Sequence, residues 1–382
     1  DHLVHNASRG IAVKPCQELL RASIGLPWSI VIKYLGSKRL LASILGDIAA
    51  AVGAHTALDL FTGTTRVAQE FKRRGVDVTA VDCATYADVL ARCYIATDAT
   101  VVDKDELARA IDELNALPGR PGYFTETFCV ASRYFQPKNG ARVDVMRDAI
   151  EARYRSDPLY PVLLTALMLA ADRVDSTTGL QMAYLKQWAA RAHNDIELRA
   201  PELLAGPGTA MRGDAMSVVD DVRHVDLAYL DPPYNQHRYF TNYHVWETLV
   251  RWDAPPHYGV ACKRIDSRND DTHSPFNGKR SMPGAMHSVI SRAKADVVVV
   301  SYNDESWVTT EQMSRWLKDA GHADVAILAF DAKRYVGAQI GIHNPAGEKV
   351  GSVSHLRNTE YIFVAGSTEH VDAATWAVGG CR

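Results

Sequence analysis

Short apolar runs that end abruptly at polar residues recur along the chain and predict its strands. Residues 225–230 are mostly bulky and apolar, and the run stops at Asp231, two prolines and a tyrosine. Such runs, bounded by turn-forming residues, are typical of buried strands in a largely parallel sheet. Further runs predict strands at residues 56–61, 76–81, 296–303 and 325–330. We therefore expect an α/β fold that binds ligands at the carboxyl ends of its strands.

Helical periodicity dominates the middle of the chain. Amphipathic stretches predict helices at residues 144–154, 159–174 and 184–192. We expect residues 105–205 to form a helical insertion into an α/β domain made of residues 30–104 and 206–366. Residues 1–29 and 367–382 are then terminal extensions. Residues 333–342 and 358–364 flank a turn and predict an antiparallel pair that closes a mixed, mostly parallel sheet.

Composition limits the possible functions only loosely. With 382 residues, 47% of them apolar, the chain can bury a large core. Its net charge of −3 means that a nucleic-acid-binding surface would have to be local. The six cysteines lack metal-site spacing, so we expect free thiols and no bound metal. No run suits a membrane span or a secretion signal, which predicts a cytoplasmic protein.

The tetrapeptide from Asp231 to Tyr234 carries the clearest chemistry. Its two prolines lack N–H donors and fix φ, so they should form a stiff loop where the strand ends. The Asp231 carboxylate and the Pro232 carbonyl could accept hydrogen bonds from an exocyclic amine and make its lone pair available to an electrophilic methyl group. Tyr234 could stack on a base, an interaction worth roughly 1–3 kcal/mol. The alternative is an ordinary strand-to-loop junction.

Two earlier segments predict a small-molecule site. A strand, a turn at residues 62–65, a helix and a second strand ending at Asp82 form a βαβ opening, and Asp82 is placed to bind ribose hydroxyls. Gly36 and Ser37 open a helix whose free N–H groups, with Lys38, would suit an anionic group. Ser37 could equally be a simple N-cap. The G-x-G-x-x-G pattern of dinucleotide enzymes is absent, which disfavours an oxidoreductase.

The order of these features over residues 33–365 resembles the D12 class, or α group, of S-adenosylmethionine-dependent N6-adenine DNA methyltransferases. The shared patterns are Y-x-G-x-K from Tyr34, D-x-F-x-G from Asp59, and D-P-P-Y from Asp231. The resemblance implies a Rossmann-like class I methyltransferase fold with S-adenosyl-L-methionine as cofactor. The cofactor-binding residues that it implies are Tyr34, Gly36, Ser37, Lys38, Asp59, Phe61, Gly63, Asp82, Asp214 and Asp231.

Within this set the resemblance assigns individual roles. Asp59 would meet the methionine ammonium and Asp214 the adenine amino group, although Asp214 could equally cap a helix. One departure is Thr65, which stands where the family has a second glycine. The catalytic residues implied are Asp231, Pro232 and Tyr234. Because no Pro-Cys nucleophile is present, the pattern differs from that of C5-cytosine methyltransferases.

Cations interleaved with aromatic residues mark the candidate DNA contacts. They occur in the insertion, which the resemblance implies is the target-recognition region, just after the catalytic loop, and in the polar segment 253–285. The candidates are Arg133, Tyr134, Lys138, Asn139, Arg238, Tyr239, Tyr243, Lys263, Arg264, Lys279 and Arg280. For those in the insertion, packing in a helical core is an equal alternative.

We therefore expect methylation of N6 of a flipped adenine in a specific site on double-stranded DNA. The default role is the modification arm of a restriction–modification system, with a cognate restriction endonuclease as candidate partner. Alternative functions are methylation of RNA or of a protein amide, which would lack the helical insertion. A catalytically silent DNA-binding partner is a further alternative, which the intact Asp231 and Tyr234 disfavour.

Overall fold

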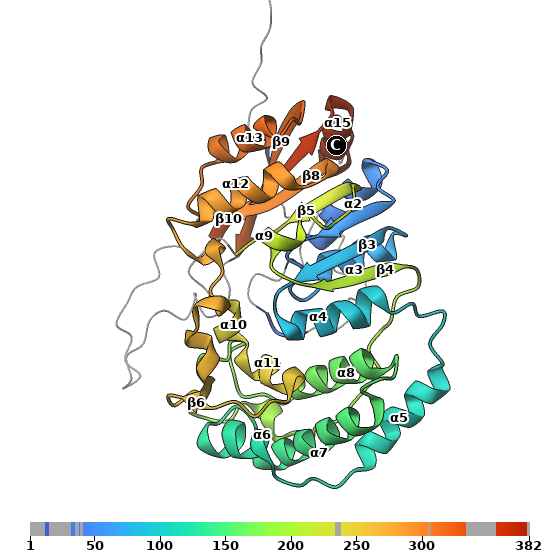
Figure 1. The fold of residues 1–382 in the computed structure, drawn as a ribbon, viewed down its shortest axis with the longest axis vertical. Helices are drawn as coiled ribbons and strands as arrows, with labels where there is room; N and C mark the ends of the chain where they lie inside the picture. Colours follow the sequence, from blue (N-terminus) through green and yellow to red (C-terminus); the bar gives the residue numbers. More distant parts are fainter. Residues whose placement is uncertain are drawn as a thin grey trace, which may run out of the picture.

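A computed structural model describes residues 12–14, 32–34, 38, 41–233, 238–304, 306–333 and 357–379. A twisted eight-stranded sheet forms the upper part of the molecule (Figure 1). Its strands, in spatial order, are β1 (Ala12–Lys14), β9 (Asp324–Lys333), β10 (Arg357–Gly366), β8 (Ala295–Asn303), β5 (Val225–Leu230), β2 (Thr56–Asp59), β3 (Asp77–Asp82) and β4 (Gly208–Arg212). Strand β10 is antiparallel to both neighbours, and the other pairs are parallel.

The central strands are apolar because both faces of the sheet are covered. In β5, Leu227 and Tyr229 belong to one buried cluster, while Ala228 and Leu230 belong to a second cluster on the opposite face. The first face packs against α2 (Ala42–Ala51), α3 (Arg66–Arg73), α4 (Thr85–Ala91), η2 (Arg92–Ala96) and α15 (Thr368–Gly379). The second packs against α9 (Ala215–Val218), α12 (Met282–Arg292) and α13 (Thr310–Asp319). The predicted Rossmann-like, mostly parallel fold is confirmed.

The antiparallel pair contains a different first strand from the one predicted. Strand β10 pairs with β9, with Ile362 opposite Leu328. The apolar run at residues 325–330 is therefore one arm of the pair, because β9 extends from it to Lys333. The predicted arm at residues 333–342 lies outside the described residues beyond Lys333. Helix α15 packs against α2, β9 and β10, so part of the expected C-terminal extension covers the sheet.

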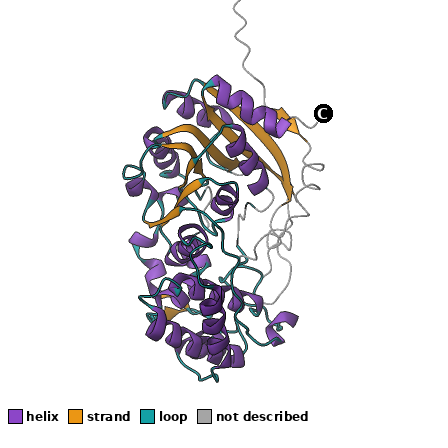
Figure 2. Cartoon of the chain, turned by 90° about the vertical axis from the view of Figure 1, so that its right-hand side faces the viewer, coloured by secondary structure: helices purple, strands orange, loops and turns teal. Residues whose placement is uncertain are grey.

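Helices of the insertion lie below the sheet (Figures 1 and 2). They are α5 (Lys104–Ala116), α6 (Tyr123–Thr125), η3 (Glu126–Ala131), α7 (Pro137–Tyr154), α8 (Tyr160–Arg173) and η4 (Ala190–His193). Pro137 occupies the first turn of α7, where a missing N–H costs nothing. The helix predicted at residues 184–192 is wrong, because only the short 3₁₀ turn η4 forms there.

Residues 238–278 lie beside these insertion helices (Figure 1). They form α10 (Tyr239–Asn242), α11 (His244–Arg251), β6 (His257–Tyr258), β7 (Lys263–Arg264), η5 (Ile265–Arg268), η6 (Asp270–Thr272) and η7 (Pro275–Asn277). The buried Arg147 of α7 donates hydrogen bonds to the carbonyl oxygens of Leu249 and Val250 at 2.8 and 2.9 Å. We call the insertion helices and residues 238–278 together the lower lobe.

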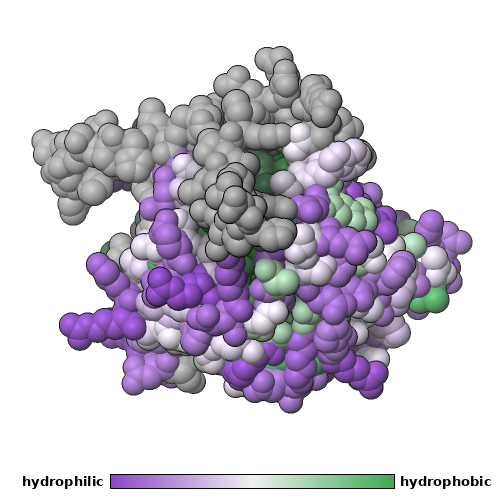
Figure 3. Space-filling view, turned by 90° about the horizontal axis from the view of Figure 1, so that it is seen from above, coloured by the Kyte–Doolittle hydropathy of each residue, from purple (hydrophilic) through white to green (hydrophobic). Residues whose placement is uncertain are grey.

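The described surface is largely hydrophilic when seen from above, with small hydrophobic patches (Figure 3). Within the described ranges, none of the helices combines the length and apolar character needed to cross a bilayer.

Candidate active site

Three carboxylates converge at one edge of the sheet. Strands β2 and β3 end at Asp59 and Asp82, and Asp231 directly follows β5. Because β2 lies between β5 and β3 and runs parallel to both, these ends meet. A cavity of about 260 Å³ opens there. It is lined by Tyr34, Leu60, Phe61, Gly63, Asp82, Cys83, Ala84, Gly213, Asp214, Ala215, Asp231, Pro233, Tyr239, Phe240, Thr272, His273, Ser274, Phe276 and Asn277.

The turn after β2 brings backbone close to this cavity. Gly63 has φ of +51°, and its N–H donates a hydrogen bond to Asp82 Oδ2 at 2.9 Å. A Cβ atom on Gly63 would lie 3.3 Å from the Tyr34 ring, so a side chain here would crowd the wall of the cavity. Glycine therefore suits both the left-handed conformation and the close approach.

Thr65, the departure from the family pattern, also has positive φ, at 62°. Its hydroxyl donates to the Thr64 carbonyl at 2.7 Å and accepts from Gln69 Nε2 at 2.8 Å. These hydrogen bonds hold a conformation that is otherwise unfavourable for a β-branched residue. The turn can thus form without the second glycine.

Asp82 and Asp214 both face the cavity and are held by backbone donors. Asp82 Oδ1 accepts from the Ala84 N–H at 3.0 Å, and burial raises the pKa of its carboxyl. Asp214 Oδ1 accepts from the Met216 N–H at 2.9 Å, so it caps α9 as the alternative reading proposed. Capping and lining are compatible, because the capping bond orients the side chain at the cavity wall.

Asp59 ends β2, next to the lining residues Leu60 and Phe61, and is 1% exposed. Its Oδ2 accepts from the Thr62 hydroxyl at 2.9 Å, while the buried Oδ1 has no hydrogen-bond partner among the described residues. Burial raises its pKa to about 7, opposed by the Thr62 hydrogen bond. An unsatisfied buried carboxylate oxygen is costly, so this position suits a ligand that brings a cationic donor.

Lys38 forms ion pairs with two carboxylates of the chain itself. Its Nζ lies 3.2 Å from Asp231 Oδ1 and 3.2 Å from Glu360 Oε2. Burial raises the pKa of Asp231 to about 6, although the Lys38 charge lowers it. Two acids therefore already surround its ammonium, and the expected contact of Lys38 with a bound ligand stays a prediction. Gly36, Ser37 and Tyr234 lie outside the described residues.

An aromatic group forms another wall of the cavity. The Tyr34 ring stacks on Tyr243 with centroids 4.5 Å apart and on Tyr239 at 5.3 Å. Tyr34 and Tyr239 line the cavity, whereas Tyr243 is fully buried. Tyr243 was expected to contact DNA, and burial contradicts that prediction. Its ring instead supports Tyr34 from behind.

Sequence reasoning missed the segment that closes one side of the cavity. Thr272, His273, Ser274, Phe276 and Asn277 line it, although residues 253–285 were expected only to contact DNA. Phe276 meets the Phe61 ring edge-on at 5.1 Å, which joins this segment to the turn after β2. Phe276 is an apolar residue in a polar stretch, and that contrast was the available signal.

Three further candidate DNA contacts are contradicted because their side chains are buried. Tyr134 donates its hydroxyl to the Gln181 carbonyl at 2.6 Å, and Asn139 donates to the Asn194 carbonyl at 2.9 Å. Arg264 is 1% exposed and forms ion pairs with Asp253 and Asp266 at 2.6 and 2.7 Å. All three hold the lower lobe together.

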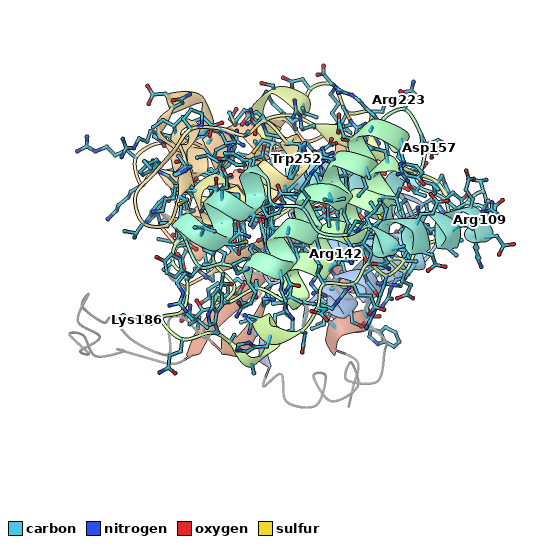
Figure 4. All side chains as sticks on the ribbon, turned by 90° about the horizontal axis from the view of Figure 1, so that it is seen from below. Arg109, Arg142, Asp157, Lys186, Arg223 and Trp252 are labelled. Carbon is cyan, nitrogen blue, oxygen red and sulfur yellow. The ribbon has the colours of Figure 1, made fainter. Side chains whose placement is uncertain are left out.

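The other candidate cations reach the surface. Lys138 pairs with Asp195, and Arg133 donates to the Lys186 carbonyl and lies 4.7 Å from the Trp188 ring centroid. Arg238 donates to His273 Nε2 at 2.6 Å. Lys279 and Arg280 are exposed, and Lys263 is partly exposed. Seen from below, Arg142 and Lys186 lie on the underside of the lower lobe (Figure 4).

Known proteins are similar to this chain in sequence. The model of the D12 class N6 adenine-specific DNA methyltransferases matches residues 34–315. Type II methyltransferase M.NlaIII of Neisseria lactamica is 28% identical over 309 residues, covering 77% of this chain and 90% of that protein. Modification methylase StsI of Streptococcus sanguinis is 28% identical over 316 residues, covering 75% of this chain and 46% of that protein.

Type II methyltransferase M.FokI of Planomicrobium okeanokoites is 28% identical over 314 residues, covering 76% of this chain and 47% of that protein. The match thus spans about half the length of the StsI and FokI enzymes. A precorrin-6Y C5,15-methyltransferase structure from Geobacter metallireducens covers 89% of this chain and 93% of its own at 10% identity, with a TM-score of 0.29, and adds nothing to the assignment. The family match extends over most of the chain, from Tyr34 to beyond β8. The chain therefore belongs to the D12 class N6 adenine-specific DNA methyltransferases.

Proposed function

We propose that the chain uses S-adenosyl-L-methionine to methylate N6 of an adenine that has left the duplex of a specific DNA site. The carrying observation is the acid-lined cavity at the carboxyl ends of β2, β3 and β5, with Asp231 at its edge. Among the described lining residues, three are acids and none is Lys or Arg. Such a cavity suits a cationic cofactor.

The cofactor contacts follow from the positions of the carboxylates. Asp82, which faces the cavity from the end of β3, would bind the ribose hydroxyls. Asp214 would accept a hydrogen bond from the adenine amino group. Asp59 Oδ1, buried and unpartnered among the described residues, would accept from the methionine ammonium. Phe61 and Phe276 supply an apolar wall.

Bound S-adenosyl-L-methionine supplies an electrophilic methyl group, and the chain supplies position and charge. Asp231 would accept a hydrogen bond from the target amine, as would the Pro232 carbonyl, which keeps the nitrogen lone pair directed at the methyl carbon. The prolines hold this geometry because they fix φ. We propose that Tyr234, next in the chain, stacks on the base.

The target adenine must leave the double helix, because pairing occupies its amino group. Tyr34 and Tyr239 offer an aromatic wall near Asp231 for the extruded base. The duplex itself needs a cationic surface, and we propose that it contacts Arg133, Lys138, Arg238, Lys263, Lys279 and Arg280. The chain as a whole has a net charge of −3, so DNA binding would depend on these cationic side chains rather than on the overall charge.

Two relatives are named type II methyltransferases and one a modification methylase. We therefore propose that this chain is the modification enzyme of a restriction–modification system, with a cognate endonuclease that cleaves the same unmodified site. Its substrate would then be cellular DNA, and we expect the enzyme in the cytoplasm.

Incubation of the purified chain with methyl-labelled S-adenosyl-L-methionine tests the proposal. Unmethylated DNA, RNA and a protein mixture would be supplied in parallel, and the labelled products would be digested and separated. We expect label only in N6-methyladenine from DNA, within one sequence motif on methylation-aware sequencing. Label in RNA or a side-chain amide, or none at all, would refute the proposal.

A further inference from the structure

Glu360 is an acid close to the catalytic loop that the mechanism above does not use. It lies on β10, opposite Asn303 of β8. Side chains alternate along a strand, so Glu360 points to the same face as Ile362 and Val364, which belong to the core cluster under α2. An acid on this otherwise apolar row needs a charged partner.

Lys38 is that partner, and the start of α2 fixes its position. The Lys38 carbonyl accepts hydrogen bonds from the N–H groups of Leu41 and Ala42 at 2.9 and 2.7 Å. Its side chain is 7% exposed, and its Nζ lies at the same distance, 3.2 Å, from Glu360 Oε2 and from Asp231 Oδ1. Asp231 and Glu360 side chains are each 17% exposed. One buried cation thus serves two acids.

Among the residues that the structure describes, these two carboxylates and one ammonium carry one negative charge in excess when all are ionised. A lysine paired with Asp231 alone would neutralise it and weaken it as a hydrogen-bond acceptor. With Glu360 competing for the same ammonium, Asp231 remains the more basic carboxylate that proton acceptance requires. We propose that Glu360 is a positioning residue for methyl transfer, which holds Lys38 between the two carboxylates and thereby keeps Asp231 able to accept the proton of the target amine. This inference rests on the catalytic role proposed for Asp231.

The proton balance follows from these contacts. In the transfer, the amine lone pair forms the bond to the methyl carbon while the carbon–sulfur bond breaks, with its electron pair going to sulfur. The methylated nitrogen then releases one proton to Asp231. Lys38 can give a proton to Glu360 while taking one from Asp231, so it remains a cation. Glu360, which is partly exposed, can return the proton to water.

Other titratable groups also surround Asp231. Tyr229 on β5 lies behind it and donates its hydroxyl to Ser301 at 2.8 Å, and Asp59 on β2 adds a second negative charge nearby. Burial raises the pKa of Asp231 most, Lys38 lowers it, and the Glu360 charge raises it. Removing the Glu360 charge should therefore lower the pKa of Asp231.

The test is the Asp231 carboxyl titration in the cofactor-free protein, followed by carbon NMR and assigned with Asp231→Asn. We expect Glu360→Gln to lower the midpoint by about half a pH unit or more. It should also lower kcat by about fivefold or more while KM for DNA changes by less than about twofold. The acid limb of the kcat–pH profile should move in the same direction as the midpoint. Glu369→Gln, the same change in the exposed first turn of α15, is the matched control and should alter neither quantity.

Glu360→Asp keeps the charge and shortens the reach to Lys38, so we expect a near-normal midpoint with reduced kcat. If Glu360→Gln does not fold, Glu360→Asp alone tests the proposal. A wild-type kcat in Glu360→Asp would then overturn it. An Asp231 midpoint that Glu360→Gln leaves unchanged would overturn it as well. Full activity in Asp231→Asn would instead refute the catalytic role of Asp231, which is a separate result.

Discussion

The Gly63 N–H donates a hydrogen bond to Asp82 Oδ2 at 2.9 Å and so ties the turn after β2 to the end of β3. The same carboxylate faces the cavity and accepts from the Ala84 N–H. One acid thus shapes the backbone around the proposed cofactor site and presents a group to the cofactor.

Asp82→Ala should weaken S-adenosyl-L-methionine binding because it removes both functions. Hydrogen bonds to a charged group contribute about 1.5–3 kcal/mol each, so we expect the Kd to rise about 10- to 100-fold. Isothermal titration calorimetry measures this directly. Asp221→Ala, at an exposed acid outside the cavity, is the control. Equal affinities in the two variants would remove Asp82 from the site.

Asp59→Asn should stabilise the fold at high pH while weakening cofactor binding. The pKa of Asp59 is about 7 in the folded protein, above its ordinary value of 3.8, because of burial. The folded state therefore holds the proton to higher pH than the unfolded state does, and this acid destabilises the fold as pH rises from about 4 through about 7.

The amide cannot ionise, so Asp59→Asn should gain on the order of 4 kcal/mol of stability at about pH 8 relative to about pH 4. It should also weaken cofactor binding, because an amide is a poorer acceptor for an ammonium. Thermal unfolding at the two pH values and calorimetry measure the two effects. A stability difference that is independent of pH would contradict the burial argument.

Arg264→Ala should destabilise the protein without specifically affecting DNA contacts. The buried guanidinium pairs with Asp253 and Asp266, and removing one member of a buried ion pair costs about 3–5 kcal/mol. We expect a clearly lowered Tm in calorimetric unfolding. Lys263→Ala, at the neighbouring and more exposed cation, should leave Tm nearly unchanged. Identical Tm values for the two variants would show that Arg264 does not hold the lower lobe together.

Lys279→Ala combined with Arg280→Ala should weaken DNA binding through lost phosphate contacts. Both side chains are exposed, and each phosphate contact contributes about one unit to the slope of log affinity against log salt concentration. We expect that slope to fall by about two, with similar losses on specific and unrelated DNA. Fluorescence anisotropy over a salt series provides the measurement. An unchanged slope would place the phosphate contacts elsewhere.

Two acids of the site, Asp82 and Asp231, could be predicted from the sequence because each follows an apolar run. Asp82 ends the run at residues 76–81, and Asp231 ends the run at residues 225–230, so parallel strands bring them to one edge. The strand ends that a sequence pattern predicts are therefore enough to indicate which residues meet at the edge of a parallel sheet. The departure at Thr65 could not be judged in advance, because its side-chain hydrogen bonds depend on Gln69 one helical turn later.

Burial in the lower lobe could not be predicted in the same way. Arg264 and Lys263 are adjacent cations in the sequence, yet only Arg264 meets two acids in a buried site. The sequence around Tyr134 suggests a residue that stacks on bases. In the structure its hydroxyl instead donates to the carbonyl oxygens of Gln181 and Ala261, which are distant in sequence. Such contacts depend on how helices pack rather than on local pattern. Phe276 was missed for the same reason, since its partner Phe61 lies more than half the chain away.

Single-turnover methyl transfer by Asp231→Ala tests the central claim most directly. The variant would be mixed with labelled S-adenosyl-L-methionine and target DNA, and cofactor affinity would be measured on the same preparation. We predict a rate lowered by about a thousandfold or more, with cofactor Kd within about threefold of the wild type, because Asp231 acts on the target amine. Transfer near the wild-type rate would contradict the account.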